Sequence, residues 1–259
     1  MLIINTIAEL KKAVENVKSE GKTIGFVPTM GALHDGHLSL IKRARLENDV
    51  VFVSIFVNPV QFNNQDDLIK YPRTLDSDVE LIGDYADYAF APSVEEVMEG
   101  AARPGHFNGV GVIVRRLLDW VQPDKVYFGE KDYQQIAVIR ELVRQCGIQS
   151  EIVPCPIVRE PNGLAMSSRN RRLTPEQFET SANIYRILVE SRKQGDVPQI
   201  KAFVEAEIAK ISDFKLDYFE IADDKTLQTV HSLAEADGVM GFITVYVGEV
   251  RLIDNIRYK

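Results

Sequence analysis

The sequence predicts a doubly wound α/β fold, in which helices cover both faces of a mostly parallel sheet. Strand-like and helix-like segments alternate from residue 24 to residue 153, which is the pattern of such folds. The run from Val50 to Phe56 is continuously apolar, as strands are when both faces of a parallel sheet are buried. Residues 216–221 and 242–247 alternate instead, so we predict a smaller α+β region with one exposed sheet face near the end of the chain.

The composition fits a globular protein of two domains. The 259 residues are 45% hydrophobic and 26% charged, which is enough to bury a full core. We place the domain boundary between residues 1–173 and residues 174–259. Thr174, Pro175 and Gln177 combine an N-cap, a first-turn proline and a capping-box glutamine, so a new helix begins there.

The composition also argues against several classes of partner. The formal net charge is -8, whereas surfaces that bind nucleic acid or anionic membranes are basic. There is no apolar run of membrane-spanning length and no signal-peptide pattern at the start, so we expect a cytoplasmic protein without a membrane partner. Cys146 and Cys155 do not make a disulfide scaffold, and we expect both to be reduced.

The first elements follow from capping and periodicity. Thr6 and Glu9 form a capping box ahead of apolar residues at helical spacing, which predicts a helix. Residues 24–27 form a short apolar run between turn residues, which predicts a buried strand. Lysine and arginine alternate with apolar residues over 37–48, which predicts an amphipathic helix ahead of the apolar strand.

The later elements follow from the same signals. In chain order we predict helices at 76–85, 110–121, 133–146, 175–193 and 200–211, with strands at 88–91, 125–128 and 148–153. Pro123 ends the second of these helices, and turn residues at 195–198 separate the last two.

The turn between the strand at 24–27 and the next helix is a candidate anion site. Gly31 and Gly36 permit sharp turns and a close approach to a ligand. His34 and His37 lie three residues apart where the helix begins, and a helix start favours an anion through its N–H groups and its dipole. Imidazoles, with an ordinary pKa of about 6.5, can donate hydrogen bonds to phosphate. The stretch therefore predicts a phosphate site.

Other interpretations of this turn fit the residue chemistry less well. A Walker P-loop needs Lys and Ser or Thr where His37 and Leu38 stand. A dinucleotide fingerprint needs a third small residue where Val114 follows the Gly-x-Gly at 109–111. A zinc site would need a third ligand beside the histidines. The sequence does not identify the ligands of any metal. The histidines could also be ordinary polar residues of a surface loop.

Two more polar loops follow predicted strands, at 58–63 and 129–135. Ligands of doubly wound sheets lie beyond the carboxyl ends of the strands, so we expect these loops to meet the one at 29–37 at a single edge. The densest basic stretch is 165–172, where small hydroxyl residues before Arg169 favour a mobile loop that binds phosphate. That stretch could equally be a solvated surface patch.

Four separated motifs resemble one known family. In chain order they read Pro-Thr-Met-Gly-Ala-Leu-His-Asp-Gly-His, Asn-Pro-Val-Gln-Phe, Gly-Glu-Lys-Asp-Tyr-Gln-Gln and Ala-Met-Ser-Ser-Arg-Asn. This set resembles the pantoate-β-alanine ligases, also called pantothenate synthetases, of the HxGH nucleotidyltransferase superfamily. The resemblance covers essentially the whole chain and implies a Rossmann-like sheet. Asp35 and Tyr133 depart from the residues common in the family, at positions that need not touch the reacting atoms.

The resemblance implies a ligase that condenses (R)-pantoate with β-alanine. ATP would be consumed through a pantoyl-adenylate with release of AMP and pyrophosphate, Mg2+ would be required, and the protein would be a homodimer. The alternative is another adenylyltransferase of the same superfamily, which would transfer AMP to a phosphorylated acceptor.

The resemblance also implies roles for individual residues. The expected ATP site comprises Met30, Gly31, Ala32, Leu33, His34, Asp35, Gly36, His37, Gly129, Glu130, Lys131, Asp132, Val158, Met166, Ser167, Ser168 and Arg169. The expected catalytic residues are His34, Lys131, Arg169 and the proton donor His37. Gln61 and Gln135 are expected to hold pantoate, with Gln61 also beside β-alanine. Taken singly, each of these residues also has a purely structural interpretation. Gln61 could be a turn residue and Gln135 an exposed helix residue. Lys131 could be a solvated loop cation and Asp132 a helix N-cap.

Overall fold

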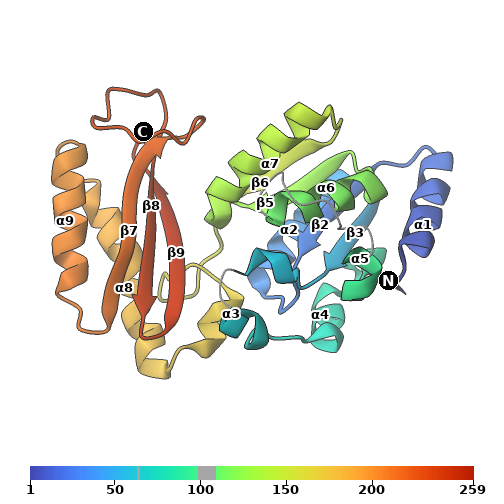
Figure 1. Cartoon of the computed structure of the whole chain (residues 1–259), viewed down its shortest axis with the longest axis horizontal. Coiled ribbons are helices and arrows are strands. Elements are labelled where there is room, and N and C mark those ends of the chain that lie inside the picture. Colours follow the sequence, from blue (N-terminus) through green and yellow to red (C-terminus); the bar gives the residue numbers. More distant parts are fainter. Residues whose placement is uncertain (63–64, 99–108) are drawn as a thin grey trace. The chain divides into compact units, whose positions relative to one another are not determined.

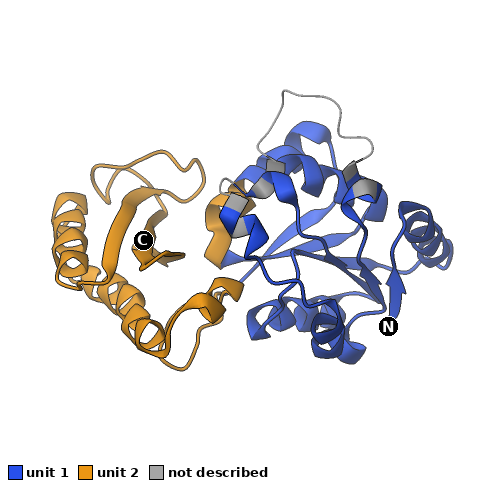
Figure 2. Ribbon diagram, turned by 60° about the horizontal axis from the view of Figure 1, so that its bottom comes forward, with its two compact units in different colours: residues 1–130, 138–156 blue, residues 131–137, 157–259 orange. Residues whose placement is uncertain are grey.

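The structure is a computed structural model that describes residues 1–62, 65–98 and 109–259 (Figure 1). The chain divides into two compact units, Met1–Glu130 with Val138–Pro156 and Lys131–Ala137 with Ile157–Lys259 (Figure 2). Compact units need not be independently folding domains, so the predicted domain boundary between residues 173 and 174 stays a prediction. No helix in the described parts of the chain is both long enough and apolar enough to cross a bilayer.

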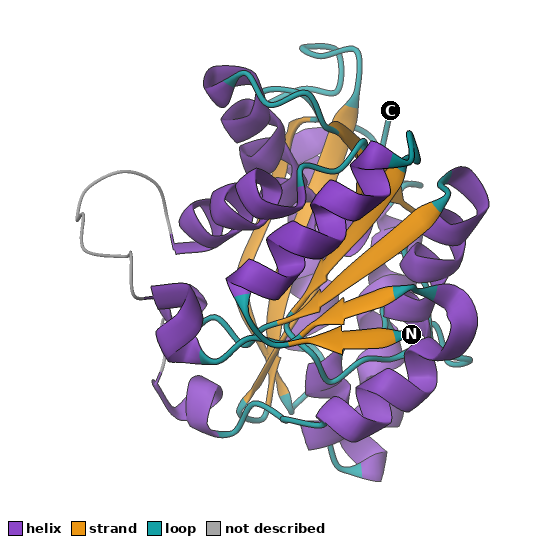
Figure 3. Ribbon diagram, turned by 90° about the vertical axis from the view of Figure 1, so that its right-hand side faces the viewer, coloured by secondary structure: helices purple, strands orange, loops and turns teal. Residues whose placement is uncertain are grey.

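The larger unit is built on a six-stranded parallel sheet, with strand order β1-β4-β3-β2-β5-β6. Its strands are β1 (Leu2–Ile4), β2 (Ile24–Thr29), β3 (Val50–Ile55), β4 (Tyr88–Phe90), β5 (Lys125–Gly129) and β6 (Glu151–Cys155). Its helices are α1 (Ile7–Ser19), α2 (Asp35–Glu47), α3 (Gln65–Ile69), α4 (Leu75–Ile82), α5 (Val94–Met98), α6 (Gly109–Val121) and most of α7 (Tyr133–Cys146). Its short 3-10 helices include η1 (Pro59–Gln61) and η2 (Gly83–Tyr85), and η3 (Glu130–Asp132) begins in this unit and ends in the smaller one. Helices lie on both sides of the strands (Figure 3), so the predicted doubly wound α/β fold is confirmed.

The strand order marks the edge at which a ligand is expected. From β2 the chain adds β3 and β4 on one side and later β5 and β6 on the other, so the order reverses between β2 and β5. Ligands of doubly wound sheets bind beyond the carboxyl ends of the strands at such a reversal. The chain leaves the neighbouring strands β3, β2 and β5 at this same edge, as predicted. Residue 63 of the predicted loop at 58–63 lies outside the described residues.

Helix α2 is fixed to the sheet by apolar packing. Leu40, Ile41 and Ala44 of this helix join a buried cluster with Val27 of β2 and Val53 of β3. Full burial of one such aliphatic side chain contributes roughly 1.5–3 kcal/mol. The start of α2, which carries the paired histidines, is therefore held against the central strand.

Several short or terminal elements differ from the prediction. The elements β1, α3 and α5 were not predicted, because they have three to five residues and show too little periodicity in the sequence. The last strand of the series begins at Glu151 rather than Ile148, because Gly147 ends α7 with φ of 63° and Ile148 donates back to the Val143 carbonyl.

The smaller unit contains an antiparallel sheet in the order β7-β8-β9, with strands at Phe214–Asp223, Val239–Val247 and Val250–Arg257. Its helices are η4 (Ser168–Arg172), α8 (Pro175–Ser191) and α9 (Val197–Ala209), and α8 and α9 lie beside the sheet (Figure 1). This confirms the smaller α+β region.

The prediction that residues 242–247 have one exposed face is wrong. The first seven residues of β8, from Val239, are all buried, and only one of its nine residues is not, because β8 is the middle strand and both of its faces are covered. Ile243 and Val245 join the core with α8 and α9, whereas Phe242 joins a second cluster with Tyr133. The strand β9 was missed.

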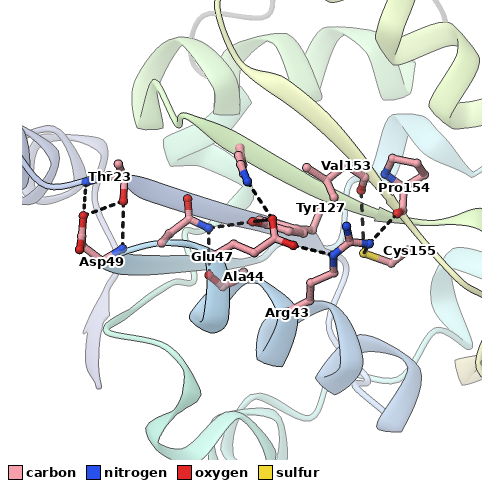
Figure 4. Close-up of polar contacts among 11 residues, drawn as sticks. Thr23, Arg43, Ala44, Glu47, Asp49, Tyr127, Val153, Pro154 and Cys155 are labelled. Carbon is pink, nitrogen blue, oxygen red and sulfur yellow. Dashed lines mark hydrogen bonds and ion pairs between the residues drawn. The ribbon is translucent and has the colours of Figure 1, made fainter.

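A polar network joins α2 to β5 and β6 (Figure 4). Glu47 Oε1 accepts from Arg43 Nε at 2.9 Å, and Oε2 accepts from Lys125 Nζ at 2.9 Å and from the Tyr127 hydroxyl at 3.0 Å. Arg43 also donates to the Pro154 carbonyl at 3.0 Å. Hydrogen bonds from Arg43 and then Lys125 lower the pKa of the Glu47 carboxyl from its usual 4.5 to about 2. The network therefore holds Glu47 ionised well into acid.

We expect Glu47→Gln to remove part of the acid sensitivity of folding. The folded pKa lies below the unfolded one, so the ionised carboxylate stabilises the fold above about pH 4.5, and that stability is lost as the pH falls toward 2. With the side chain 27% exposed, the contribution is about 1–3 kcal/mol. The free energy of unfolding, measured by urea titration at pH 7, 4 and 3, shows the difference. Glu80→Gln is the matched control, because it makes the same acid-to-amide change at an exposed position of α4. Parallel acid curves for wild type and Glu47→Gln would contradict the expectation.

Candidate active site

The rings of the paired histidines cap helix α2 by accepting hydrogen bonds from backbone N–H groups at its start. Helix α2 begins at Asp35, with His34 as its N-cap. His34 Nδ1 accepts from the Gly36 N–H at 3.1 Å, and His37 Nδ1 accepts from the His34 N–H at 3.4 Å. The two ring centroids are 4.1 Å apart. The two imidazoles thus form a reciprocal capping box, and each ring is held at a defined place at the helix start.

These hydrogen bonds define the tautomer of both rings. A backbone N–H can only donate, so the Nδ1 atoms of His34 and His37 must be the acceptors. A neutral imidazole that accepts at Nδ1 carries its proton on Nε2. Both histidines therefore present an Nε2–H donor, the group that a phosphate oxygen requires.

The backbone amides of the turn are bonded within the protein. Thr29 Oγ1 accepts from the Gly31 N–H at 3.2 Å, and the Asp78 carboxylate accepts from the N–H groups of Ala32 and Leu33 at 3.0 and 2.7 Å. The sequence suggested that backbone N–H groups would be offered to an anion here. In the structure the amides of Gly31, Ala32 and Leu33 have intramolecular acceptors, as does that of Gly36 at the helix start, so the imidazoles are among the groups suited to a ligand.

The predicted residues of this turn have different environments. Gly31 has φ of 78°, the left-handed conformation that favours glycine, whereas Gly36 lies within α2 and has no such φ. The side chains of Ala32 and Leu33 are buried, with 0% and 2% exposed, and join the packing of the turn. Met30 is half-buried and Asp35 exposed.

The turn after β3 carries Gln61. Its backbone lies in η1, whose N-cap Asn58 is buried and accepts from the Val60 N–H at 3.3 Å. The Gln61 side chain lies outside what the structure describes, so its predicted contact with pantoate stays a prediction.

The segment after β5 divides between the two units. Gly129 and Glu130 belong to the larger unit, and Lys131, Asp132 and the half-buried Gln135 belong to the smaller one. Lys131 Nζ lies 3.9 Å from Asp132 Oδ2. The amide of Asn255 on β9 donates to the Lys131 carbonyl at 3.0 Å, and the Tyr133 hydroxyl donates to the Asp224 carbonyl at 3.1 Å. The smaller sheet therefore anchors the backbone that presents Lys131 and Gln135.

The remaining predicted residues come from one hairpin of the smaller unit. The Met166 N–H donates to the Val158 carbonyl at 3.0 Å, so these two positions lie side by side although they are apart in sequence. Ser167 caps η4 by accepting from the Arg169 N–H at 3.3 Å. Residues 168–172 form a capped 3-10 helix in which Ser168 is buried. The expected mobility of this stretch and its binding of phosphate stay predictions.

The residues that hold these segments were not predicted from the sequence. The carboxylate of Asp78, within the predicted helix at 76–85, binds the turn before His34. Arg159 forms a bidentate pair with Asp254 at 2.7 and 3.0 Å, which ties the hairpin to β9. Neither role has a local signal, because each depends on partners distant in sequence. The described residues contain no cluster of three or more His, Cys, Asp or Glu that could hold a metal ion.

The fold and these side chains define an α/β protein with a candidate anion site at the start of the helix after its central strand. The model of one family, described as pantoate-beta-alanine ligase, matches residues 2–257. The chain belongs to the pantoate-beta-alanine ligase family.

Individual relatives agree with this assignment. The chain is 52% identical to a pantothenate synthetase of Bacteroides thetaiotaomicron over 280 aligned positions, which include all of the chain and 99% of the relative. It is 53% identical to one of Phocaeicola vulgatus, with both chains fully covered. The chain has 259 residues, so these relatives carry residues that it lacks.

Solved structures are similar over the whole chain. A pantothenate synthetase of Thermus thermophilus superimposes with a TM-score of 0.90 at 40% identity, covering 100% of this chain and 99% of the other. A pantoate-beta-alanine ligase of Francisella tularensis, complexed with beta-gamma ATP and beta-alanine, has a TM-score of 0.81 at 36% identity, with coverages of 100% and 98%.

Proposed function

We propose that this ligase condenses pantoate with β-alanine in two steps, of which the first joins pantoate to AMP and releases pyrophosphate. The observation that carries the proposal is the family match over residues 2–257. A relative with a matching fold has been crystallised with beta-gamma ATP and beta-alanine, which supports ATP and the amine as substrates here.

The first step needs alignment and charge neutralisation more than it needs a base. A carboxylic acid with a pKa of about 4 is already ionised at pH 7, so pantoate can attack the α-phosphorus directly. Its barrier falls when the two groups are held in line and when the negative charge on the phosphates is neutralised. The Nε2–H groups of His34 and His37 suit that second task, and we assign His37 as the proton donor. Lys131 and Arg169 would add positive charge.

The other predicted residues would bind the substrates. We propose that the Met30–His37 turn, Gly129–Asp132, Val158 and Met166–Arg169 surround ATP. Gln61 and Gln135 would bind the hydroxyls and the carboxylate of pantoate. A neutral amide can recognise these groups without holding the nucleophile as tightly as an arginine would.

The second step requires a neutral amine. An alkylammonium such as β-alanine has a pKa near that of lysine, about 10, so it must lose a proton before it attacks the adenylate. We assign no residue to this proton transfer. AMP is then the leaving group, and the new bond is the amide of pantothenate.

Three further properties are part of the proposal. Mg2+ binds polyphosphates with few protein ligands, so we propose that it enters with ATP, and we assign no step to it. We also propose that the protein is a homodimer and that it works in the cytoplasm. Analytical ultracentrifugation and cell fractionation test these two points.

Isotope exchange tests the proposed reaction. Enzyme, ATP, Mg2+ and labelled pyrophosphate are incubated with and without pantoate, and label entering ATP is measured. We expect exchange only with pantoate, because pyrophosphate re-enters ATP only if pantoyl-adenylate has formed. Exchange that ignores pantoate would favour an adenylyltransferase with another acceptor. Absence of AMP formation with both substrates would indicate an inactive site.

A further inference from the structure

We propose that Asp78 is a positioning residue for the first step of the reaction. Its carboxylate would hold the turn that carries His34 and His37 in the geometry that ATP requires. This inference rests on the proposed function, because it takes that turn to be part of the nucleotide site. Asp78 itself is not assigned any contact with substrate.

The Asp78 carboxylate is buried and binds two successive amides of the turn. It lies on α4 with 2% of its surface exposed. Oδ2 accepts from the Ala32 N–H at 3.0 Å, and Oδ1 accepts from the Leu33 N–H at 2.7 Å and from the Thr74 hydroxyl at 3.2 Å. Hydrogen bonds to an ionised acceptor are shorter and stronger than neutral ones. One side chain from another helix therefore clamps the peptide units just before His34.

The turn adopts a backbone conformation that needs such a clamp. Ala32 has φ of 51°, a left-handed value that residues with a side chain rarely adopt. Gly31 precedes it with φ of 78°, and a Cβ atom there would lie 3.0 Å from Asp78 Oδ2 and 3.1 Å from Ile55 Cγ2. The positive φ and the close approach of Asp78 and Ile55 together account for the glycine, and the hydrogen bond from the Ala32 N–H to Asp78 holds the strained alanine in place.

The clamp is connected directly to both imidazoles. Leu33 is followed by the N-cap His34, whose ring accepts from the Gly36 N–H and whose own N–H donates to His37. A shift of the peptide units at 32–33 therefore moves both Nε2 donors. Misplacing a catalytic group by about 1 Å can cost roughly a hundredfold in rate.

Asp78→Asn tests the proposal, because it keeps the size of the side chain and places an NH2 donor against one of the two backbone N–H donors. We expect the rate of pantoate-dependent pyrophosphate exchange to fall about tenfold to a hundredfold. We expect the KM for β-alanine to stay within about twofold, since the change affects the first step. The amide proton shifts of Ala32 and Leu33, measured by NMR, are expected to move with the loss of the carboxylate.

Two variants of the same helix separate positioning from general destabilisation. Ile82→Val removes a methyl group from a fully buried side chain of α4 and leaves the clamp intact. Glu80→Gln makes the same acid-to-amide change at an exposed position. Both are expected to keep wild-type exchange. If Asp78→Asn fails to fold, Thr74→Val removes the hydroxyl that supports Oδ1, and we expect a several-fold loss.

The possible outcomes are distinct. Wild-type exchange in folded Asp78→Asn, or an equal loss in Ile82→Val, would overturn the inference. If wild type shows no pantoate-dependent exchange, the proposed function fails instead, and the amide shifts still show whether Asp78 holds the turn.

Discussion

His37→Ala is expected to slow formation of the adenylate by an amount equivalent to about 2–4 kcal/mol, with little change in pantoate binding. Nδ1 of His37 accepts from the His34 backbone, and the Nε2–H group lies on the other side of the ring. Nε2–H can therefore donate a hydrogen bond to the negative charge that grows on the phosphates in the transition state. A donor that acts mainly in the transition state lowers the rate more than it weakens ground-state binding. Single-turnover quench measurements, with pantoate titrated, separate the two effects.

Two further variants test whether the imidazole itself is required. His37→Gln keeps a side chain that can accept from the His34 N–H, as glutamine does at this position of a capping box. Recovery of the rate in His37→Gln would mean that the imidazole itself is not required, because the glutamine amide can both cap the helix and donate a hydrogen bond. His231→Ala removes an exposed histidine of the smaller unit and is expected to change nothing. An unchanged single-turnover rate in His37→Ala would refute the assigned role.

The paired histidines also illustrate how much of the site the sequence could predict. Their place at a helix start follows from a strand, a glycine turn and an amphipathic pattern, all within one short stretch, and local patterns of this kind are visible in sequence. The tautomer of each ring and the clamp from Asp78 depend on distances between backbone and side-chain atoms. Such contacts need the folded chain, and no spacing in the sequence reveals them.

In the fold, too, features with a local sequence pattern could be predicted, whereas features that depend on distant contacts could not. The apolar run at 50–56 identified a strand buried on both faces, and the parallel sheet confirmed it. The prediction for β8 is wrong because alternation in sequence assumes one solvated face, whereas Phe242 packs in a buried cluster with Tyr133, which is distant in sequence. β9 was not predicted, although the sequence contains a local signal for it. Gly248, with φ of 56°, and Glu249 form the two-residue connection that joins β8 to β9, and glycine in such a connection is a hairpin signal.

Asp254→Asn is expected to destabilise the protein by about 3–5 kcal/mol, the usual cost of breaking a buried ion pair. The Asp254 side chain is 3% exposed and that of Arg159 is 18% exposed. Both guanidinium Nη atoms donate to the carboxylate, and the guanidinium lies 3.5 Å from the centre of the Tyr185 ring. The variant leaves this cation in place without its counter-charge. Urea unfolding followed by far-UV circular dichroism measures the loss, because the single tryptophan lies in the larger unit.

Asp217→Asn provides the matched comparison, because Asp217 pairs with Arg251 in the same sheet at 3.1 Å with both side chains exposed. Exposed pairs contribute about 0.2–1 kcal/mol, so that variant is expected to lose little. The double variant Arg159→Met with Asp254→Leu removes both charges and is expected to be more stable than Asp254→Asn alone. That order of stabilities would show that the cost comes from an uncompensated buried charge. A loss in Asp254→Asn no larger than in Asp217→Asn would instead mean that water reaches Arg159, and that other contacts hold the hairpin carrying Val158 and Met166 to β9.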